Sequence, residues 1–334
     1  MVKRSQAPAI FLTRLTSSSR ISKYCFYLDQ FVLLPIILFF WQLKFDAIII
    51  GDHSNGPSGF LVIPKKLVVM VHDSIAIRGG LGQIPDYDRS VGRLGAMLQR
   101  LIVLSLRKSQ AVLANPGPLS QELRELGVSC HIEVIGCPVD ISRLTHQKAM
   151  PPRQITELEK FALYVGSDAG RKRKALLVDV WRSDALWKSE YKLVFAGFTS
   201  ERNKRQFEEL LPDRITCVND VTEAELRWLY ENCSCVITAS AHEGFCIPIL
   251  EAIFFEKCVI TPNNPFFKEV FGPNVNAVME LDGRDAQRIL SAIDGYDPSQ
   301  SALPREELLT RYSFPTFAQS VRRVIASMMK YRRS

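Results

Sequence analysis

The sequence has no hydrophobic run long enough to cross a bilayer. Its most apolar stretch, residues 30–43, covers 14 positions and is interrupted by Pro35, whereas a spanning helix needs about 20 apolar residues. The first residues also lack the small-residue cleavage site that is typical of a secretory signal peptide. We interpret residues 24–43 as a helix, bent at Pro35, that packs on a sheet. The alternative is a helix face that dips into the bilayer interface.

Disulfide and metal-binding patterns are missing as well. The eight cysteines form no CxxC pair, and Cys235, Cys246 and Cys258 lie in apolar runs, where a thiol behaves as a small hydrophobe. This usage favours a reducing, cytoplasmic setting. No His/Cys cluster has metal-ligand spacing, so we expect no metal site. Repeats and DNA- or RNA-binding motifs are also absent, and we expect no nucleic-acid partner.

What the chain does contain is enough length and apolar content for two folded domains. Its 334 residues exceed what one hydrophobic core usually serves, and 47% apolar with 23% charged residues is ordinary for a globular protein. The net charge of +7 lies in the first part: residues 1–150 hold 17 Lys/Arg and 10 Asp/Glu, against 25 and 25 afterwards. This asymmetry favours an acidic partner surface. We prefer an anionic membrane over plain solvation or nucleic acid.

Segments with strand and helix patterns alternate along the chain. Apolar runs at 45–50, 67–71, 111–114 and 131–135 alternate with helical patterns at 91–108 and 119–126. Proline and glycine between positions 136 and 152 mark a linker, and a second alternating series follows. The pattern predicts an α/β protein with two parallel-sheet domains, residues 1–150 and 151–314. We expect the final segment, 315–334, to be a helix that crosses back to the first domain.

The stretch from Cys235 to Ile260 is the most informative part of the sequence. A short strand at 235–238 leads into a polar loop, Pro248 opens a helix, and a second strand follows at 258–260. Ligands bind at the carboxyl ends of such strands. We expect Glu243 on the loop and Glu251 in the first helical turn to reach this edge, where a helix N-terminus attracts phosphate. A buried strand–helix unit with a surface loop is the plainer alternative.

These residues resemble a known family. Glu243-Gly244-Phe245, followed by Pro248 and Glu251, is similar to the E-G-F-x-x-P-x-x-E signature of the retaining, nucleotide-sugar-dependent glycosyltransferases of family 4. Tyr164-Val165-Gly166 with Arg171-Lys172 resembles the family's basic loop, and Val71-His72-Asp73 resembles the V-x-x-H-D of its acceptor domain. The resemblance covers nearly the whole chain. It implies the GT-B fold, in which two Rossmann-like domains face each other across a cleft.

The resemblance also implies a role for each matching residue. The catalytic residues would be Glu243 against the donor sugar, Lys172 on the departing pyrophosphate and His72 on the acceptor side. Glu251 matches the carboxylate that holds the ribose hydroxyls. The remaining donor-binding positions are Gly166, Ser167, Arg171, Gly244, Phe245 and Cys246, and the further acceptor-side positions are His53 and Asp73. Stabilisation of a developing anion is commonly the largest catalytic contribution.

Two features depart from the family's pattern. Ser167 stands where the family has a second pyrophosphate-binding cation, an arginine. Either Arg171, Arg173 or Lys174 supplies that charge, or Ser167 hydrogen-bonds the phosphate. The family also begins with a strand and a glycine-rich loop. Here residues 9–12 offer the best strand and the first glycine is Gly51. Either this first segment is shortened or the chain begins late, and in both cases we expect that phosphate-binding loop to be missing.

We therefore expect a retaining, metal-independent hexosyltransferase that takes a nucleotide-diphosphate sugar as donor and needs no cofactor. The acceptor would be a glycan or lipid-linked glycan of surface-polysaccharide biosynthesis. The protein would be cytoplasmic, with peripheral contact at the inner membrane face. The alternative, motivated by Ser167 and the short start, is a catalytically impaired GT-B subunit that binds a nucleotide or a partner protein. A GT-B epimerase acting on the nucleotide sugar is a third interpretation.

Overall fold

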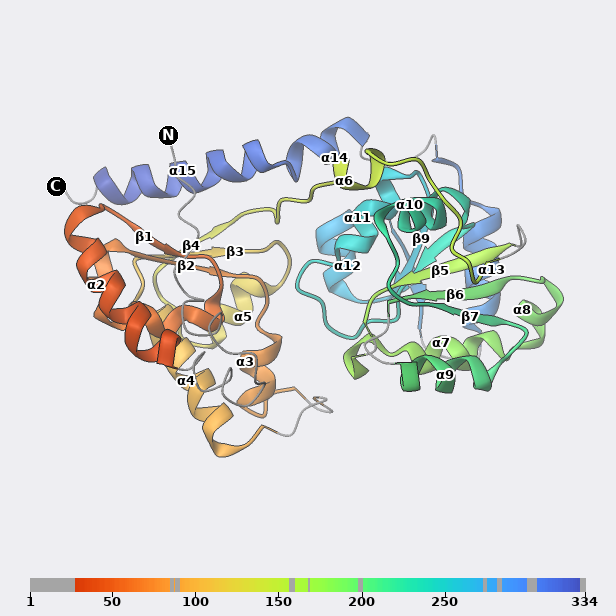
Figure 1. Ribbon diagram of the computed structural model, residues 1–334, viewed down its shortest axis with the longest axis horizontal. Coiled ribbons are helices and arrows are strands. Elements are labelled where there is room, and N and C mark those ends of the chain that lie inside the picture. The colour runs from red at the N-terminus through yellow and green to blue at the C-terminus, as the bar shows by residue number, and fades with distance from the viewer. Residues whose placement is uncertain are drawn as a thin grey trace. The chain divides into compact units, whose positions relative to one another are not determined.

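A computed structural model describes residues 28–84, 87, 91–155, 160–167, 169–197, 201–272, 275–280, 284–298 and 305–330. The chain forms two compact units (Figure 1). Among the described residues, the first unit contains 28–84, 91–135 and 318–330, and the second contains residue 87 and those between 136 and 317. The units divide at Gly136, whereas the predicted domains divide at residue 150. The predicted strand at 9–12 lies outside the described residues.

The predicted linker belongs to the second unit because it is fastened there. The amide of Val139 donates to the carbonyl of Tyr312 at 2.9 Å. Helix α6 (Ser142–Thr145) packs on α10 (Glu223–Asn232). The last helix, α15 (Phe314–Lys330), begins in the second unit and joins the first from Ala318 onward.

The first unit is built on a parallel sheet of four strands in the order β1-β2-β3-β4. Its elements are η2 (Asp29–Leu33), α2 (Leu34–Lys44), β1 (Ile48–Ile50), η3 (His53–Leu61), η4 (Pro64–Lys66), β2 (Leu67–Val71), α3 (Ile75–Gly80), α4 (Arg93–Lys108), β3 (Ala111–Ala114), α5 (Leu119–Glu125) and β4 (His131–Val134). All residues of β2 and β3 are buried, because helices cover both faces of the sheet.

Helix α2 follows a π-helical turn and has two different faces. The amide of Leu34 donates to the carbonyl of Asp29, and Pro35, which has no amide hydrogen, stands in the first turn of α2. The predicted bend at Pro35 is therefore a widened turn just before it. Leu38 is buried in the core of this unit, with Trp41 packed against that core. The opposite face, which includes Phe39 and Phe40, is exposed.

The second unit has a parallel sheet of six strands in the order β10-β9-β8-β5-β6-β7. The chain runs outward from β5 (Phe161–Val165) through β6 (Lys192–Ala196) to β7 (Ile215–Val218). It then returns to place β8 (Cys235–Ile237) on the other side of β5, followed by β9 (Cys258–Pro262) and β10 (Asn276–Met279). This is the doubly wound order. Successive strands are added on one side of β5 up to β7 and on its other side from β8 onward, so the strand order reverses between β5 and β8.

The helices of the second unit begin at recognisable capping signals. In α10, Thr222 and Glu225 form a reciprocal capping box. In α12 (Pro265–Phe271), Asn264 accepts a hydrogen bond from the amide of Phe266. The other helical elements are η5 (Gly170–Lys172), α7 (Lys174–Trp181), α8 (Asp184–Lys188), α9 (Glu201–Leu210), α11 (Ile247–Phe254), α13 (Asp285–Asp294) and α14 (Arg305–Arg311). Within the described part of the chain, no helix is both long enough and apolar enough to cross a bilayer.

Candidate active site

The loops that follow β5 and β8 bring Glu243 and Lys172 together. These strands are neighbours at the point where the strand order reverses, which is where doubly wound sheets bind ligands. Lys172 Nζ donates to Glu243 Oε1, and Arg171 Nη1 lies 3.3 Å from Glu243 Oε2. The side chain of Glu243 is only 5% exposed. A buried carboxylate is tolerated here because two cations contact it.

The two loops are fastened to each other through the backbone as well. The amide of Ala241 donates to the carbonyl of Arg171 at 2.9 Å, and Arg171 Nη1 donates to the carbonyl of His242 at 2.8 Å. Asn264 Nδ2, at the start of α12, donates to the carbonyl of Ala241 at 3.1 Å. These hydrogen bonds therefore fix the two loops that carry Glu243 and Lys172.

Helix α11 begins beside this cluster with an unusual backbone conformation. Cys246, its N-cap residue, has φ 62° and ψ 64°, a left-handed conformation that costs a side-chain-bearing residue energy. Pro248 follows in the first turn, as predicted. The ring of Phe245 is buried 5.1 Å from that of Tyr312 and 6.2 Å from that of Phe271. Phe245 thus anchors the loop through its side chain, which leaves only its backbone to act toward a ligand.

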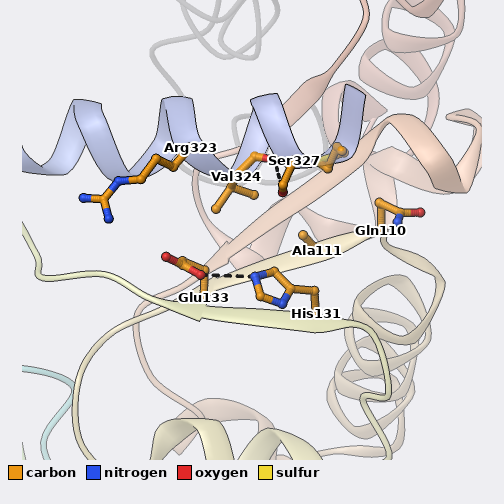
Figure 2. A pocket seen from close by; sticks show the side chains of 8 residues that line it. Gln110, Ala111, His131, Glu133, Arg323, Val324 and Ser327 are labelled. Carbon is orange, nitrogen blue, oxygen red and sulfur yellow. Dashed lines mark hydrogen bonds and ion pairs between the residues drawn. The ribbon is translucent and has the colours of Figure 1, made fainter. Parts of the chain in front are cut away.

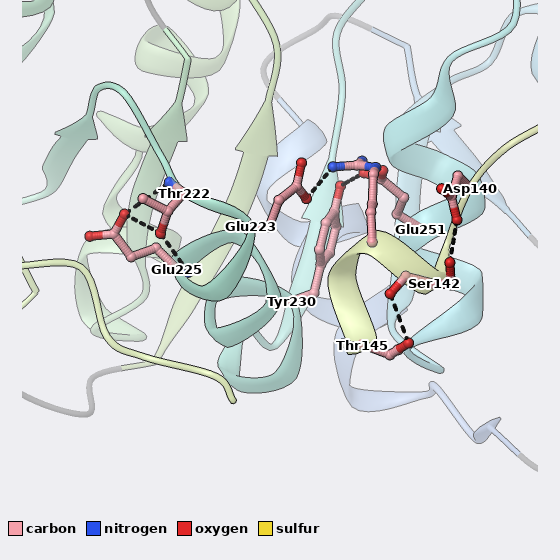
Figure 3. Close-up of polar contacts among 9 residues, drawn as sticks. Asp140, Ser142, Thr145, Thr222, Glu223, Glu225, Tyr230 and Glu251 are labelled. Atoms are coloured by element: carbon pink, nitrogen blue, oxygen red, sulfur yellow. Dashed lines mark hydrogen bonds and ion pairs between the residues drawn. The ribbon is translucent and has the colours of Figure 1, made fainter. Parts of the chain in front are cut away.

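The second predicted carboxylate, Glu251, lies in a separate polar network on α11. It is 2% exposed. Tyr230 on α10 donates to its Oε2 at 2.7 Å (Figure 3). Arg143 on α6 contacts its Oε1 and also Glu223. Burial raises the pKa of Glu251 above its usual 4.5, although Tyr230 and Arg143 both act to lower it. The pKa of Tyr230 is raised well above its usual 10, mainly by burial and next by the negative charge of Glu251.

Arg143 is the residue of this site that the sequence reasoning missed. It is 108 positions from Glu251 and lies in the segment interpreted as a linker. The short helix α6 presents it, and Ser142 Oγ donates to Asp140 Oδ1 at 2.5 Å at the start of that helix (Figure 3). In the sequence, only the segment from Gly136 to Asp140 indicated that the chain enters the second unit near α6. It carried no information about a contact with Glu251.

The other predicted donor-side residues are placed as follows. Gly166 directly follows β5 with φ 155°, and its amide donates to the carbonyl of Ala196 at 2.9 Å. Ser167 is exposed directly after it. Lys174 is buried, donates to the carbonyl of Gly197 at 2.8 Å and lies 5.1 Å from the centre of the Tyr164 ring. Of the cations considered as replacements for the family's arginine, Arg171 is therefore the one that contacts Glu243.

In the first unit, the predicted acceptor-side residues gather where β1 and β2 end. His72 Nε2 lies 3.0 Å from the carbonyl oxygen of Gly51. His53 is buried, with its Nδ1 3.9 Å from Asp52 Oδ1. Burial lowers the pKa of His53 below its usual 6.5, although the negative charges of Asp52 and Asp73 act to raise it. Asp73 Oδ1 accepts from the amide of Ile75 at 2.9 Å and so starts α3.

A family model described as "Glycosyl transferases group 1" matches residues 146–296. The resemblance to this glycosyltransferase family is confirmed. The match contains Lys172, Glu243 and Glu251, which the structure places around the carboxyl ends of β5 and β8 and on α11.

Individual relatives agree with the group 1 glycosyltransferase match. The O-antigen chain mannosyltransferase RfbU of Salmonella typhimurium is 25% identical over 173 residues, which is 50% of this chain and 47% of that protein. The chain thus matches about half the length of this relative. Sucrose-phosphate synthase from Thermosynechococcus elongatus superimposes with a TM-score of 0.68 at 16% identity, covering 89% of this chain and 77% of that one. The lipopolysaccharide outer core galactosyltransferase WaaB gives 0.56 at 17% identity, over 90% and 81%. The fold is GT-B.

A hollow of about 420 Å³ in the first unit is unrelated to these residues (Figure 2). It lies at Gln110 and Ala111 beside the start of β3, and at His131 and Glu133 on β4, under α15. His131 Nε2 and Glu133 Oε2 are 3.1 Å apart there. Doubly wound proteins bind ligands at the carboxyl ends of the strands, whereas this hollow begins at their amino ends.

Proposed function

We propose that this protein is a retaining, metal-independent glycosyltransferase that moves a hexose from a nucleotide-diphosphate sugar to a glycan or lipid-linked acceptor. Surface-polysaccharide biosynthesis is the setting, as the names of RfbU and WaaB suggest. The observation that carries the proposal is the contact of Glu243 with Lys172 and Arg171, at the carboxyl ends of β5 and β8. We propose a cytoplasmic protein in peripheral contact with the inner membrane face.

The chemistry that we propose for this cluster is stabilisation of a departing nucleoside diphosphate. Lys172 and Arg171 bring two positive charges to one position, and both are oriented by Glu243 before any ligand arrives. As the bond between the sugar and the diphosphate breaks, negative charge develops on the diphosphate oxygen. Cations already in place stabilise that charge without reorganising. Glu243 then accepts hydrogen bonds from sugar hydroxyls.

Glu251 has a different role in the proposal. A buried carboxylate with both oxygens already oriented by Tyr230 and Arg143 is suited to accept hydrogen bonds from the two hydroxyls of a ribose. The backbone amides of Gly244, Phe245 and Cys246 at the start of α11 would face the diphosphate. His72 and His53 in the first unit would face the acceptor.

The proposal is tested by assaying donor binding and transfer separately. We expect one of UDP, GDP or dTDP to raise the melting temperature, because a ligand that binds only the folded state stabilises it. Lys172→Gln should lower kcat by about 100-fold or more while changing nucleotide affinity much less. Lys188→Gln, on the exposed surface of α8, is the matched control. The anomeric proton coupling of the product, measured by NMR, tests retention.

Three results would contradict the proposal. An unchanged kcat in both Lys172→Gln and Glu243→Gln would remove the cluster from the chemistry. Nucleotide binding without transfer or donor hydrolysis, across a broad panel of donor sugars and acceptors, would instead support the catalytically impaired GT-B subunit. Conversion of the nucleotide sugar without any acceptor would indicate an epimerase.

A further inference from the structure

The outer face of η2 and α2 is an exposed apolar surface. It consists of Val32, Leu33, Ile36, Phe39, Phe40 and Leu43. These positions recur at helical spacing and so form one stripe along the helix. Phe40 is 60% exposed and Leu43 is 74% exposed. We call this stripe the apolar face of α2.

This face differs from the exposed side of an ordinary surface helix. Such a helix has apolar residues toward the core and charged residues toward water, and a helix that is apolar all round is normally buried. Leu38 and Gln42 form the inner side of α2 and are buried, so the core covers that side and not the outer one. Its outer side has no charged residue before Lys44. A contiguous apolar surface of this kind marks an interaction site.

The carboxyl end of α2 extends the surface and fixes its shape. Gln42 Nε2 donates to the carbonyl of Leu61 at 3.0 Å, and the amide of Ile63 donates to Gln42 Oε1 at 2.7 Å. Lys66 Nζ donates to the carbonyl of Phe45 at 3.0 Å. These bonds hold exposed Leu61 and Ile63 beside the end of the helix. The exposed lysines Lys44 and Lys65 lie at the same end.

Helix α4 continues the apolar surface on the other side of η3. A groove of about 350 Å³ lies between Phe31 and the α4 side chains Leu94, Met97 and Leu101. Leu94 and Met97 are exposed, as is Leu104 two turns further along. The surface therefore spans two helices that are joined through η3, which packs against both.

The charges on helices α2 and α4 are of one sign. Helices α2 and α4 together carry five basic side chains (Lys44, Arg93, Arg100, Arg107 and Lys108) and no Asp or Glu. Residues 1–27, which precede η2, add five more (Lys3, Arg4, Arg14, Arg20 and Lys23) and again no acid. The buried Asp29 and the exposed Asp46 are the acidic residues that flank α2 in sequence.

We propose that the apolar face of α2, together with the exposed side of α4, docks on the surface of an anionic lipid bilayer. The aromatic and aliphatic side chains enter the boundary between headgroups and acyl chains. The lysines and arginines contact the anionic headgroups. This deepens the peripheral membrane contact of the proposed function, but docking needs neither donor nor acceptor and can be tested without them.

Charge favours an anionic bilayer over the two other candidates that could cover this face, residues 1–27 and a second copy of the chain. Residues 1–27 carry the same positive sign as α2 and α4, so covering the face with this segment would bring like charges together. A second copy of the chain would do the same. An anionic bilayer supplies both the apolar medium and the opposite charge.

The experiment measures binding of the full chain to vesicles by co-sedimentation. Vesicles of phosphatidylcholine alone are compared with vesicles that contain about 30% phosphatidylglycerol. We expect Phe40→Gln/Leu43→Gln to reduce the partition coefficient about tenfold or more on anionic vesicles. Lys44→Gln/Lys65→Gln should reduce it several-fold on anionic vesicles only, and high salt should reproduce that loss. Met150→Gln/Leu210→Gln, at exposed apolar positions of the second unit, is the matched control.

A second readout comes from the tryptophans. Trp41 lies on α2, whereas the other three, Trp181, Trp187 and Trp228, belong to the second unit. Dibrominated lipids should quench the fluorescence of the chain, and Trp41→Phe should abolish most of that quenching.

Several outcomes would overturn the proposal. The first is vesicle binding by Phe40→Gln/Leu43→Gln equal to that of the unchanged chain. The second is a chain that binds only after residues 1–27 are removed, which would show that this segment covers the face. The third is a dimer that dissociates in the same double variant while no vesicle binding is seen. Nucleotide binding, assayed in parallel, separates a failed docking proposal from a failed transferase proposal.

Discussion

At the scale of single residues, the two carboxylates of the signature occupy different environments. Glu243 contacts two cations on the loop after β5. Glu251 is held by Tyr230 and Arg143 in a buried position that raises its pKa. Environments that separate two acids in this way usually give them separate tasks. We assign the electrostatics of the leaving group to the Glu243 cluster and the grip on the nucleoside to Glu251.

The first prediction concerns Glu251 and its hydroxyl donor. Glu251→Gln should weaken nucleotide binding by roughly 10- to 150-fold, since hydrogen bonds to a charged group contribute about 1.5–3 kcal/mol. Tyr230→Phe should weaken it less, by about tenfold or below, because the carboxylate remains but loses one orienting bond. Isothermal titration calorimetry with the preferred nucleoside diphosphate measures both. An equal loss in the two variants would contradict the assignment of the ribose contact to Glu251.

The second prediction is a pH dependence that Arg143 controls. The ionised form of Glu251 accepts the ribose hydrogen bonds, so nucleotide affinity should fall as pH decreases through its raised pKa. Arg143 acts to lower that pKa. Arg143→Gln should therefore raise it further and move the loss of affinity to higher pH.

This shift is measured from dissociation constants between pH 5 and 8. Arg182→Gln is the control, because Arg182 forms an exposed ion pair with Asp179 at 2.7 Å on α7 and the loop after it. Superimposable pH profiles for Arg143→Gln and the unchanged chain would exclude this role for Arg143.

At the scale of elements, the sheets were the most predictable part of the fold. The predicted bounds of β2 and β3 agree with the structure, because buried parallel strands are continuous apolar runs. Strand β10 (Asn276–Met279) was not predicted. Helix α9 was also missed. Its sequence, ERNKRQFEEL, is almost entirely polar, and its two apolar residues, Phe207 and Leu210, are too few to indicate a helix.

The same reasoning explains which parts of the candidate site could be found. Lys172 and Glu243 follow strands at which polar residues are expected, so strand topology alone brings them to one edge. The contact between Arg143 and Glu251 depends on how α6 packs against α10. The apolar face of α2 was foreseen only as an alternative, because a sequence pattern shows that a helix is apolar without showing which side the core covers.

The third prediction tests the turn between η5 and α7. Arg173 has φ 50° and ψ 38° and its side chain is exposed. Arg173→Gly should raise the free energy of unfolding by about 1 kcal/mol, because glycine adopts the left-handed conformation without the steric cost. Transfer activity should not change, since Arg171 rather than Arg173 contacts Glu243. Urea denaturation measures the first effect, and a fall in kcat would show that Arg173 supplies charge to the diphosphate.

At the scale of the whole molecule, the donor-side residues all belong to one unit. Lys172, Glu243, Glu251 and Arg143 lie between positions 136 and 317, whereas His53 and His72 lie in the other unit. Nucleotide binding should therefore stabilise the second unit directly. The tryptophans make this measurable, because Trp41→Phe leaves only the three tryptophans of the second unit.

The fourth prediction uses that variant. With a nucleoside diphosphate at about 100 times its dissociation constant, the second unit should gain about 2.7 kcal/mol. Tryptophan fluorescence should then show a single unfolding transition shifted to higher denaturant concentration. Circular dichroism reports the helices of both units and should retain an unshifted component from the first. Adding Glu251→Gln should reduce the gain of the second unit to about 0.3–1.4 kcal/mol at the same nucleotide concentration, given the 10- to 150-fold weaker binding expected above. An equal shift in both signals would mean that the two units unfold as one cooperative body, because the ligand would then stabilise the whole chain.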